Sequence, residues 1–218
     1  MKEKFMNGLL TLAVVLMMQL LWWFGIHGPN VMSAVTTPFM TKMMAQNLEL
    51  YQAGEGITAS GVFYTAGSKY SIIANPFASG WFSSTGSGIT MGLIVAIMLF
   101  SKRDDFKAIA KLAIPCGIFN INEPIIFGIP MVMNPMFAVP FFLAPIACAS
   151  LGYLVQYLGL CPLFVISVPW TTPVGLFGFL ASSGNIMGGI WQAVIIIAVS
   201  TLIYTPFVIA SNRQEEAA

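Results

Sequence analysis

The chain has 218 residues, of which 57% are hydrophobic and only 8% are charged, and its formal net charge is +1. Soluble domains carry about 25% charged residues, so this composition excludes an ordinary soluble domain and predicts an all-α, polytopic membrane protein. A near-neutral chain also lacks the basic surface that a nucleic-acid-binding protein needs, which excludes that class of protein.

Four apolar segments are long enough to cross a bilayer as full transmembrane helices of about 20 residues. They cover approximately residues 5–26, 84–101, 134–158 and 186–210. The first segment begins after Lys2 and Lys4 like a signal peptide, but it continues to Ile26 without a small-residue cleavage site. We therefore interpret it as a retained span.

Positive charges flank the predicted spans at three places, and such charges favour the cytoplasmic side. They lie at the N-terminus, in the loop that contains Lys102 and Arg103, and at Arg213. An even number of crossings between these places puts the N-terminus, the central charged loop and the tail 212–218 in the cytoplasm. Lys42 and Lys69 run counter to this orientation, because it places their segment outside or within the fold.

Between the spans, residues 38–51 set apolar side chains at helical spacing against polar ones, which predicts an amphipathic helix along the membrane interface. Three further stretches, 57–84, 117–130 and 160–184, are too apolar for ordinary loops and too often interrupted by proline and glycine for spans. Non-helical backbone at membrane depth survives only under protein cover or beside a water-filled cavity. These stretches are therefore predicted to be re-entrant hairpins.

Glu123 needs the most explanation, because this carboxylate lies among asparagines and prolines inside an apolar part of the chain. A charged carboxylate at the bilayer centre costs about 2.5–3.5 kcal/mol even on the insertion scale. Glu123 therefore requires a partner, a wet cavity or a ligand. Nearby, Pro115, Pro124 and Pro130 prevent a continuous helix, which indicates an irregular site covered by protein.

The polar groups of these interrupted segments suit a sugar, which has many hydroxyls and one apolar face. Carboxylates and amides exchange hydrogen bonds with hydroxyls, and an indole covers the C–H face. The alternative reading is that the histidine is an ordinary interfacial residue and that the asparagines and threonines only satisfy interrupted backbone. The candidate residues are His27, Asn120, Asn122, Glu123, Trp170, Thr171 and Thr172.

Cys116, Cys148 and Cys161 stand in apolar surroundings without a CxxC spacing, so we interpret them as packing residues rather than as a disulfide framework or a zinc site. The chain has no pair of nucleophile and base, and no metal-ligand spacing, that would support an intramembrane hydrolase. The sequence therefore predicts no catalytic residue, no metal site and no cofactor.

Three blocks of sequence carry a resemblance to a known family. They are residues 24–30 (FGIHGPN), 117–124 (GIFNINEP) and 168–173 (VPWTTP). In order and spacing they resemble the IIC membrane component of the sugar phosphotransferase system, in its lactose/cellobiose/diacetylchitobiose family, and the likeness runs through nearly the whole chain. The resemblance implies a carrier that binds sugar at mid-membrane, moves it by an elevator-like displacement and presents its C6 hydroxyl to a cytoplasmic IIB partner.

The same resemblance implies roles for individual residues. Glu123 and His27 match positions at which family members contact the sugar near the hydroxyl to be phosphorylated. Trp22, Asn122 and Trp170 fall where family members line the sugar site, and Thr171, beside Trp170, completes the predicted substrate-binding set. IIB carries the phosphoryl group and works together with IIA, so this chain is expected to be a carrier subunit.

Family members are longer, with an N-terminal half that supplies further spans and the dimer interface. The resemblance covers their C-terminal half, so residues 1–211 are predicted to form the sugar-binding half of an EIIC domain, followed by a cytoplasmic tail, 212–218. An N-terminal half or a second copy of the chain is then the expected partner within the bilayer.

The leading prediction is a permease IIC component that imports a β-linked disaccharide, of the cellobiose, diacetylchitobiose or lactose type, coupled to phosphorylation by IIB. One alternative is a proton-coupled sugar porter in which Glu123 is the proton site and His27 tunes it. The other is a truncated membrane remnant that does not transport.

Overall fold

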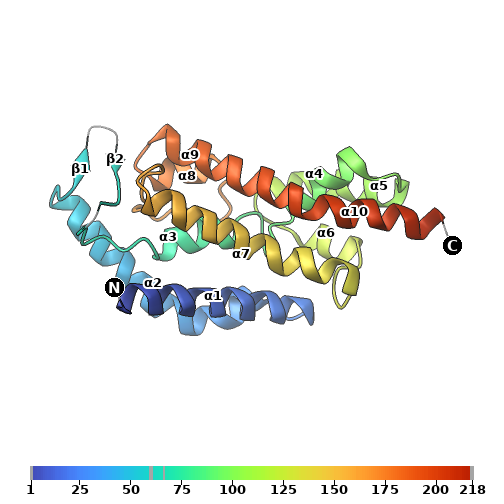
Figure 1. Cartoon of the computed structure of the whole chain (residues 1–218), viewed down its shortest axis with the longest axis horizontal. Helices are drawn as coiled ribbons and strands as arrows, with labels where there is room; N and C mark the ends of the chain where they lie inside the picture. Colours follow the sequence, from blue (N-terminus) through green and yellow to red (C-terminus); the bar gives the residue numbers. More distant parts are fainter. Residues whose placement is uncertain (1, 59–60, 66, 217–218) are drawn as a thin grey trace.

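The computed structural model describes residues 2–58, 61–65 and 67–216. It is an elongated bundle whose longest helices run along the long axis (Figure 1). α1 packs on α2 and α7, α7 packs on α10, and α10 packs on α4. The elements are α1 (Lys2–Trp23), α2 (Gly28–Gln52), β1 (Ile57–Thr58), β2 (Gly61–Val62), α3 (Asn75–Phe77), η1 (Ala78–Phe82), α4 (Met91–Phe100), α5 (Asp104–Ile118), α6 (Glu123–Gly128), α7 (Pro135–Tyr157), α8 (Leu176–Ala181), α9 (Ile186–Ala193), η2 (Val194–Val199) and α10 (Ser200–Glu216).

Among the described residues, two helices are long and apolar enough to cross a membrane. One is α7, with 23 residues, and the other runs without a break through α9, η2 and α10 over 28 residues, Ile186–Arg213. At about 1.5 Å per residue, both exceed the roughly 30 Å of a bilayer core. They coincide with the predicted segments 134–158 and 186–210, so the sequence located both helices.

A tight turn joins α1 to α2 and makes them an antiparallel pair. The predicted segment 5–26 ends earlier than expected, because Gly25 has a left-handed φ of +78°, and the N–H of Ile26 donates back to the carbonyl of Leu21 (2.9 Å). α2 then begins at Gly28, and the Nδ1 atom of His27 accepts from the N–H of Asn30 (3.2 Å). This side-chain cap fixes where α2 starts.

Two predicted elements have different bounds in the structure. The helix predicted over 38–51 forms, but it is the second half of a longer helix, because α2 begins at Gly28 and runs unbroken through Pro38. The predicted span 84–101 is also too long, since α4 has only ten residues, Met91–Phe100. Thr85 and Ile89 have positive φ angles of 59° and 50°, which a helix cannot include.

In the structure, short helices and irregular backbone interrupt all three stretches that the sequence predicts to be non-spanning. The first contains the β1–β2 hairpin, in which Ile57 pairs with Val62, followed by the short α3 and one π-helical segment, η1. The second turns at the end of α5 and continues as the six-residue α6. The third runs extended before the six-residue α8. In the described part of the chain, none of the three stretches forms a helix of spanning length.

The buried side chain of Gln192 on α9 connects two of these interrupted stretches. Its Oε1 atom accepts from the N–H groups of Gly175 (2.9 Å) and Gly178 (2.7 Å), and its Nε2 group donates to the carbonyl of Gly80 (3.0 Å). Backbone polar groups inside an apolar fold need such partners. Gln192 therefore stabilises α8 and η1 against the long helix that carries it.

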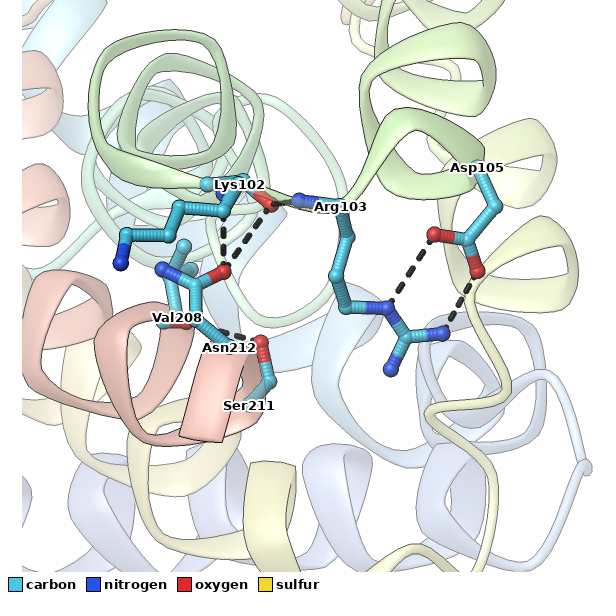
Figure 2. A network of polar contacts seen from close by, with 7 residues as sticks. Lys102, Arg103, Asp105, Val208, Ser211 and Asn212 are labelled. Atoms are coloured by element: carbon cyan, nitrogen blue, oxygen red, sulfur yellow. Dashed lines mark hydrogen bonds and ion pairs between the residues drawn. The ribbon is translucent and has the colours of Figure 1, made fainter. Parts of the chain in front are cut away.

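The charged loop between α4 and α5 is fixed to the end of α10 (Figure 2). Asn212 of α10 accepts from the N–H of Lys102 (2.9 Å) and donates to the carbonyl of Phe100 (3.0 Å). Arg103 forms an ion pair with Asp105 (2.5 Å). The hydrogen bond from Arg103 lowers the pKa of the Asp105 carboxyl below its usual value. The loop is thus ordered by hydrogen bonds to a helix distant in sequence.

Candidate functional site

A cavity of about 1170 Å³ opens where the α1–α2 turn meets the three interrupted stretches. The α1–α2 side contributes the rings of Trp22 and His27, and the beginning of α6 contributes Glu123. The full lining is Trp22, His27, Pro29, Asn30, Ser33, Asn75, Ser79, Ser83, Gly86, Ser87, Asn120, Ile121, Asn122, Glu123, Pro124, Ser167, Val168, Pro169 and Trp170. The cavity is therefore bounded mostly by irregular backbone, which carries polar groups into an apolar fold.

The structure brings together five of the six predicted substrate-binding residues in this cavity. His27, Glu123, Asn122, Trp170 and Trp22 all belong to its lining, although they come from segments up to 148 positions apart in the chain. Thr171 is half-buried and is not among the lining residues.

Glu123 is the first residue of α6, and its side chain is half-buried at the cavity wall. In the described residues, no protein group donates a hydrogen bond to its carboxylate and no cation pairs with it. A carboxylate has two oxygens that accept hydrogen bonds. The Glu123 carboxylate is therefore available to accept hydrogen bonds from a ligand in the cavity.

His27 has one ring nitrogen engaged by the protein and one available. Its Nδ1 atom accepts from the N–H of Asn30 (3.2 Å), so the neutral ring assigned from this bond carries its proton on Nε2. The ring stands 4.8 Å from that of Trp22, at an angle of 52°, and Trp22 is 4% exposed. Packing and capping thus hold a hydrogen-bond donor in the cavity that also contains the Glu123 acceptor.

Asn122, next to Glu123, is buried and attached to the loop that precedes α4. Its Nδ2 group donates to the carbonyl of Ser87 (2.6 Å). Gly86 lies directly against the Asn122 amide, and a Cβ atom at Gly86 would overlap it. The remaining amide oxygen has no protein donor within the described part of the chain. Asn122 therefore both fixes the start of α6 and presents an acceptor.

Asn120 connects three segments that line the cavity. Its φ angle is +65°, and its Oδ1 atom accepts from the N–H of Thr85 (2.7 Å). Its Nδ2 group donates to the carbonyls of Trp170 (2.5 Å) and Thr172 (2.8 Å). The side chain of Trp170, by contrast, is 61% exposed, so the turn is held by its backbone and the indole lies open to a ligand.

Sequence reasoning missed a row of polar residues on one wall. Asn75, Ser79, Ser83 and Ser87 all line the cavity, and they recur at every fourth position. Asn75 and Ser79 lie in the helical α3–η1 segment, and Ser83 and Ser87 lie in the bend and turn after it. Four polar residues at regular spacing within an apolar stretch were a usable signal. None of the four side chains has a protein hydrogen-bond partner among the described residues, which leaves their polar groups for water or ligand.

Taken together, the cavity joins a free carboxylate, an imidazole donor, amides and hydroxyls to the indole of Trp170. This combination matches a polyhydroxylated ligand, because hydroxyls exchange hydrogen bonds with the polar groups while an indole covers an apolar ring face. Among the described residues, no three metal-ligating side chains gather. The arrangement is suited to binding and orientation.

The family model "Phosphotransferase system, EIIC" matches residues 4–145 of the chain. The chain is 36% identical to the oligo-beta-mannoside-specific EIIC component of Bacillus subtilis over 93% of its own length and 43% of that protein. It is also 36% identical to the cellobiose-specific EIIC component of Lactococcus lactis subsp. lactis, over 94% of the chain and 43% of that relative. A lactose-specific EIICB component of Staphylococcus aureus is 34% identical over 86% of the chain and 31% of that relative.

Among solved structures, the chain is similar to the transporter ChbC, the IIC component of the N,N'-diacetylchitobiose-specific phosphotransferase system. The TM-score is 0.84 at 34% sequence identity, over 95% of this chain and 45% of that one. The chain thus spans less than half the length of the relatives that it matches.

Proposed function

Because the chain belongs to the EIIC family of the sugar phosphotransferase system, whose members are integral membrane components, we propose that it forms the sugar-binding part of a permease. The permease imports a β-linked disaccharide of the cellobiose, diacetylchitobiose or lactose type, coupled to phosphorylation. The observation that carries this proposal is the cavity in which Glu123, His27 and Trp170 meet. Family membership favours this function over a proton-coupled porter.

In this proposal each predicted residue has a distinct task. The carboxylate of Glu123 accepts from sugar hydroxyls, and the Nε2–H of His27 donates to a sugar oxygen. The exposed indole of Trp170 stacks on a sugar ring, and Asn122 and Trp22 complete the wall. Thr171 contributes through its position beside Trp170, on the turn that carries the indole. The chemistry of phosphoryl transfer belongs to the IIB partner.

We propose further that residues 1–211 are the C-terminal half of an EIIC domain, followed by the tail 212–218. The similarity covers 45% of ChbC, a share that is compatible with one half of an EIIC domain. α10 continues to Glu216, so the proposed tail begins within this helix. An N-terminal half or a second copy of the chain would cover the open side of the cavity. The orientation places the N-terminus, the loop around Arg103 and the tail in the cytoplasm. In it, α1, α7, the α9–α10 helix and the segment 84–101, which contains the ten-residue α4, cross the membrane, and the interrupted stretches are re-entrant.

The proposed soluble partner is a cytoplasmic IIB, which in turn receives its phosphoryl group from IIA. An EIICB relative, by its name, joins the two components in one protein, which supports close cooperation of IIC with IIB. The ordered loop between α4 and α5 lies on the side that this orientation gives to the partner.

Uptake of radiolabelled cellobiose tests the proposal in cells that supply IIA, IIB and the remaining part of an EIIC relative. Glu123→Gln keeps the size of the side chain and removes its charge, so uptake is expected to be abolished while the amount of protein in the membrane is unchanged. Wild-type uptake by the Glu123→Gln variant would rule out the role given to this carboxylate.

A further inference from the structure

Asn120 lines the cavity, but both of its amide N–H donors are used by the protein. An asparagine side chain has two N–H donors and one carbonyl oxygen. Both donors are engaged, at 2.5 Å by the carbonyl of Trp170 and at 2.8 Å by that of Thr172, and the oxygen accepts from the N–H of Thr85 at 2.7 Å. Asn120 is 6% exposed, so it has no N–H left to donate to a ligand.

The turn that Asn120 contacts carries the indole of the proposed sugar site. The N–H of Thr172 donates to the carbonyl of Pro169 (3.0 Å), which closes the turn around Trp170. In the described structure, the Trp170 ring stacks on no other aromatic ring, and 61% of its surface is exposed. Side-chain packing therefore restrains this indole weakly, and the backbone bonds from Asn120 restrain its position.

We infer that Asn120 is a positioning residue, which sets the indole of Trp170 at the correct place relative to Glu123. Asn120 precedes Glu123 by three positions, so one short segment carries the acceptor and also anchors the turn that bears the indole. This inference rests on the proposed function, because it gives Asn120 a role in sugar affinity through Trp170. It differs from direct binding, since the bonds of Asn120 all go to backbone.

The identity of the residue follows from two requirements. The backbone of Asn120 is left-handed, a conformation that asparagine tolerates better than most residues, and the turn needs two donors. Asn120→Gly keeps the backbone conformation and removes the amide. Asn120→Asp keeps the acceptor for Thr85 and the size of the side chain but loses both donors. Comparing the two variants therefore distinguishes the need for the amide donors from the need for a left-handed backbone. If one variant fails to fold, the other still tests the inference.

The test is a double-mutant cycle on the chain in lipid nanodiscs, with cellobiose affinity measured by isothermal titration calorimetry. Trp170→Ala is expected to weaken binding about tenfold, the scale of one aromatic stacking contact. Asn120→Gly and Asn120→Asp are expected to weaken it by a similar factor. The double variant Asn120→Gly/Trp170→Ala is expected to bind no more weakly than Trp170→Ala, because Asn120 acts through the indole.

Asn47 supplies the matched control. It is 1% exposed, lies outside the cavity lining, and joins α2 to Ser71 by two hydrogen bonds of 2.7 and 2.8 Å. Asn47→Ala removes a comparable buried amide and is expected to lower the melting temperature with unchanged cellobiose affinity.

The outcomes separate the inference from the function on which it rests. If the wild-type chain binds no β-linked disaccharide, the proposed function fails. If Trp170→Ala weakens binding but the Asn120 variants do not, or if the two effects multiply in the double variant, Asn120 has no positioning role and the inference is overturned.

Discussion

At the residue scale, we propose that His27 has two separable tasks. Nδ1 caps α2 through the N–H of Asn30, and Nε2 is proposed to donate to the sugar. We expect His27→Ala to cost about 1 kcal/mol of unfolding free energy through loss of the cap, together with about a five- to tenfold loss of cellobiose affinity. Thermal unfolding and calorimetric titration in nanodiscs measure the two effects.

His27→Ser is the matched variant. A serine hydroxyl caps a helix well but is too short to replace the imidazole donor. Stability should therefore return to the wild-type value while affinity stays low. Recovery of affinity in His27→Ser would show that the histidine serves only as a cap.

Gly86 is required by the close approach of Asn122. Its φ angle is +81°, and a Cβ atom there would overlap the Asn122 amide. Gly86→Ala is expected to displace Asn122 and weaken cellobiose binding about tenfold or more, on the scale of one lost polar contact and added strain.

Gly54 also has a left-handed φ, +74°, but no atom lies within 4 Å of the place that a Cβ atom would take there. Gly54→Ala should therefore carry only the conformational cost, and reduced sugar affinity in this control would contradict the steric explanation.

At the scale of elements, Asn212 should contribute more to the free energy of unfolding than the ion pair beside it. Asn212→Ala leaves the partly buried backbone groups of Phe100 and Lys102 without their partner, and the loss of these two hydrogen bonds is expected to cost about 1–3 kcal/mol. The Arg103–Asp105 pair is half-exposed, and such pairs contribute about 0–1 kcal/mol. Thermal unfolding of Asn212→Ala and Asp105→Asn compares the two contributions. A larger loss of unfolding free energy in Asp105→Asn than in Asn212→Ala would contradict this ranking.

The pH dependence of this pair has a definite sign. Arg103 lowers the pKa of the Asp105 carboxyl in the folded state from its usual 3.8. The contribution of Asp105 to stability is therefore fully present above about pH 3.8 and is lost as the pH falls through the lowered value. The difference in melting temperature between the wild type and Asp105→Asn should stay constant from about pH 7 to pH 5 and shrink below about pH 3.8. A difference that shrinks near neutral pH would contradict this assignment.

The elements that sequence predicted well are those decided by local pattern. Continuous apolar runs located α7 and the α9–α10 helix, and clusters of proline and glycine located the interrupted stretches. The predicted span began too early at residue 84, although Gly86 and Gly88, which both have positive φ angles, marked the irregular turn before α4. The helix over 38–51 begins ten residues earlier than predicted, at Gly28, since α2 tolerates Pro38 in its interior.

The candidate site shows the same division between local and long-range information. Short blocks marked His27, Glu123 and Trp170, which the structure brings to one cavity. The task inferred for Asn120 was not visible in sequence, because its bonding partners lie 35 to 52 positions away.

At the scale of the whole molecule, the polar cavity lies in an apolar fold and is assembled from the three interrupted stretches together with the α1–α2 turn. The chain matches less than half of each relative's length, and we propose that a further part of the permease covers the open side of the cavity. We therefore expect transport to depend on partners that a self-contained porter would not need.

Coupling to phosphorylation gives a prediction for the complete permease. Cellobiose uptake in cells should be lost when IIB is deleted and should persist when an uncoupler dissipates the proton gradient, as long as the phosphoryl donor is maintained. The Glu123→Gln permease supplies the background rate. Uptake that collapses with the proton gradient and survives loss of IIB would instead establish a proton-coupled porter.

The most direct measurement is calorimetric titration of cellobiose and related β-linked disaccharides into the chain in nanodiscs, compared with Glu123→Gln. A hydrogen bond to a charged group contributes about 1.5–3 kcal/mol, so we expect binding by the wild type and an affinity loss of about ten- to a hundredfold in Glu123→Gln. Equal affinity in the two proteins, at equal folded fraction, would contradict the claim that Glu123 binds the sugar.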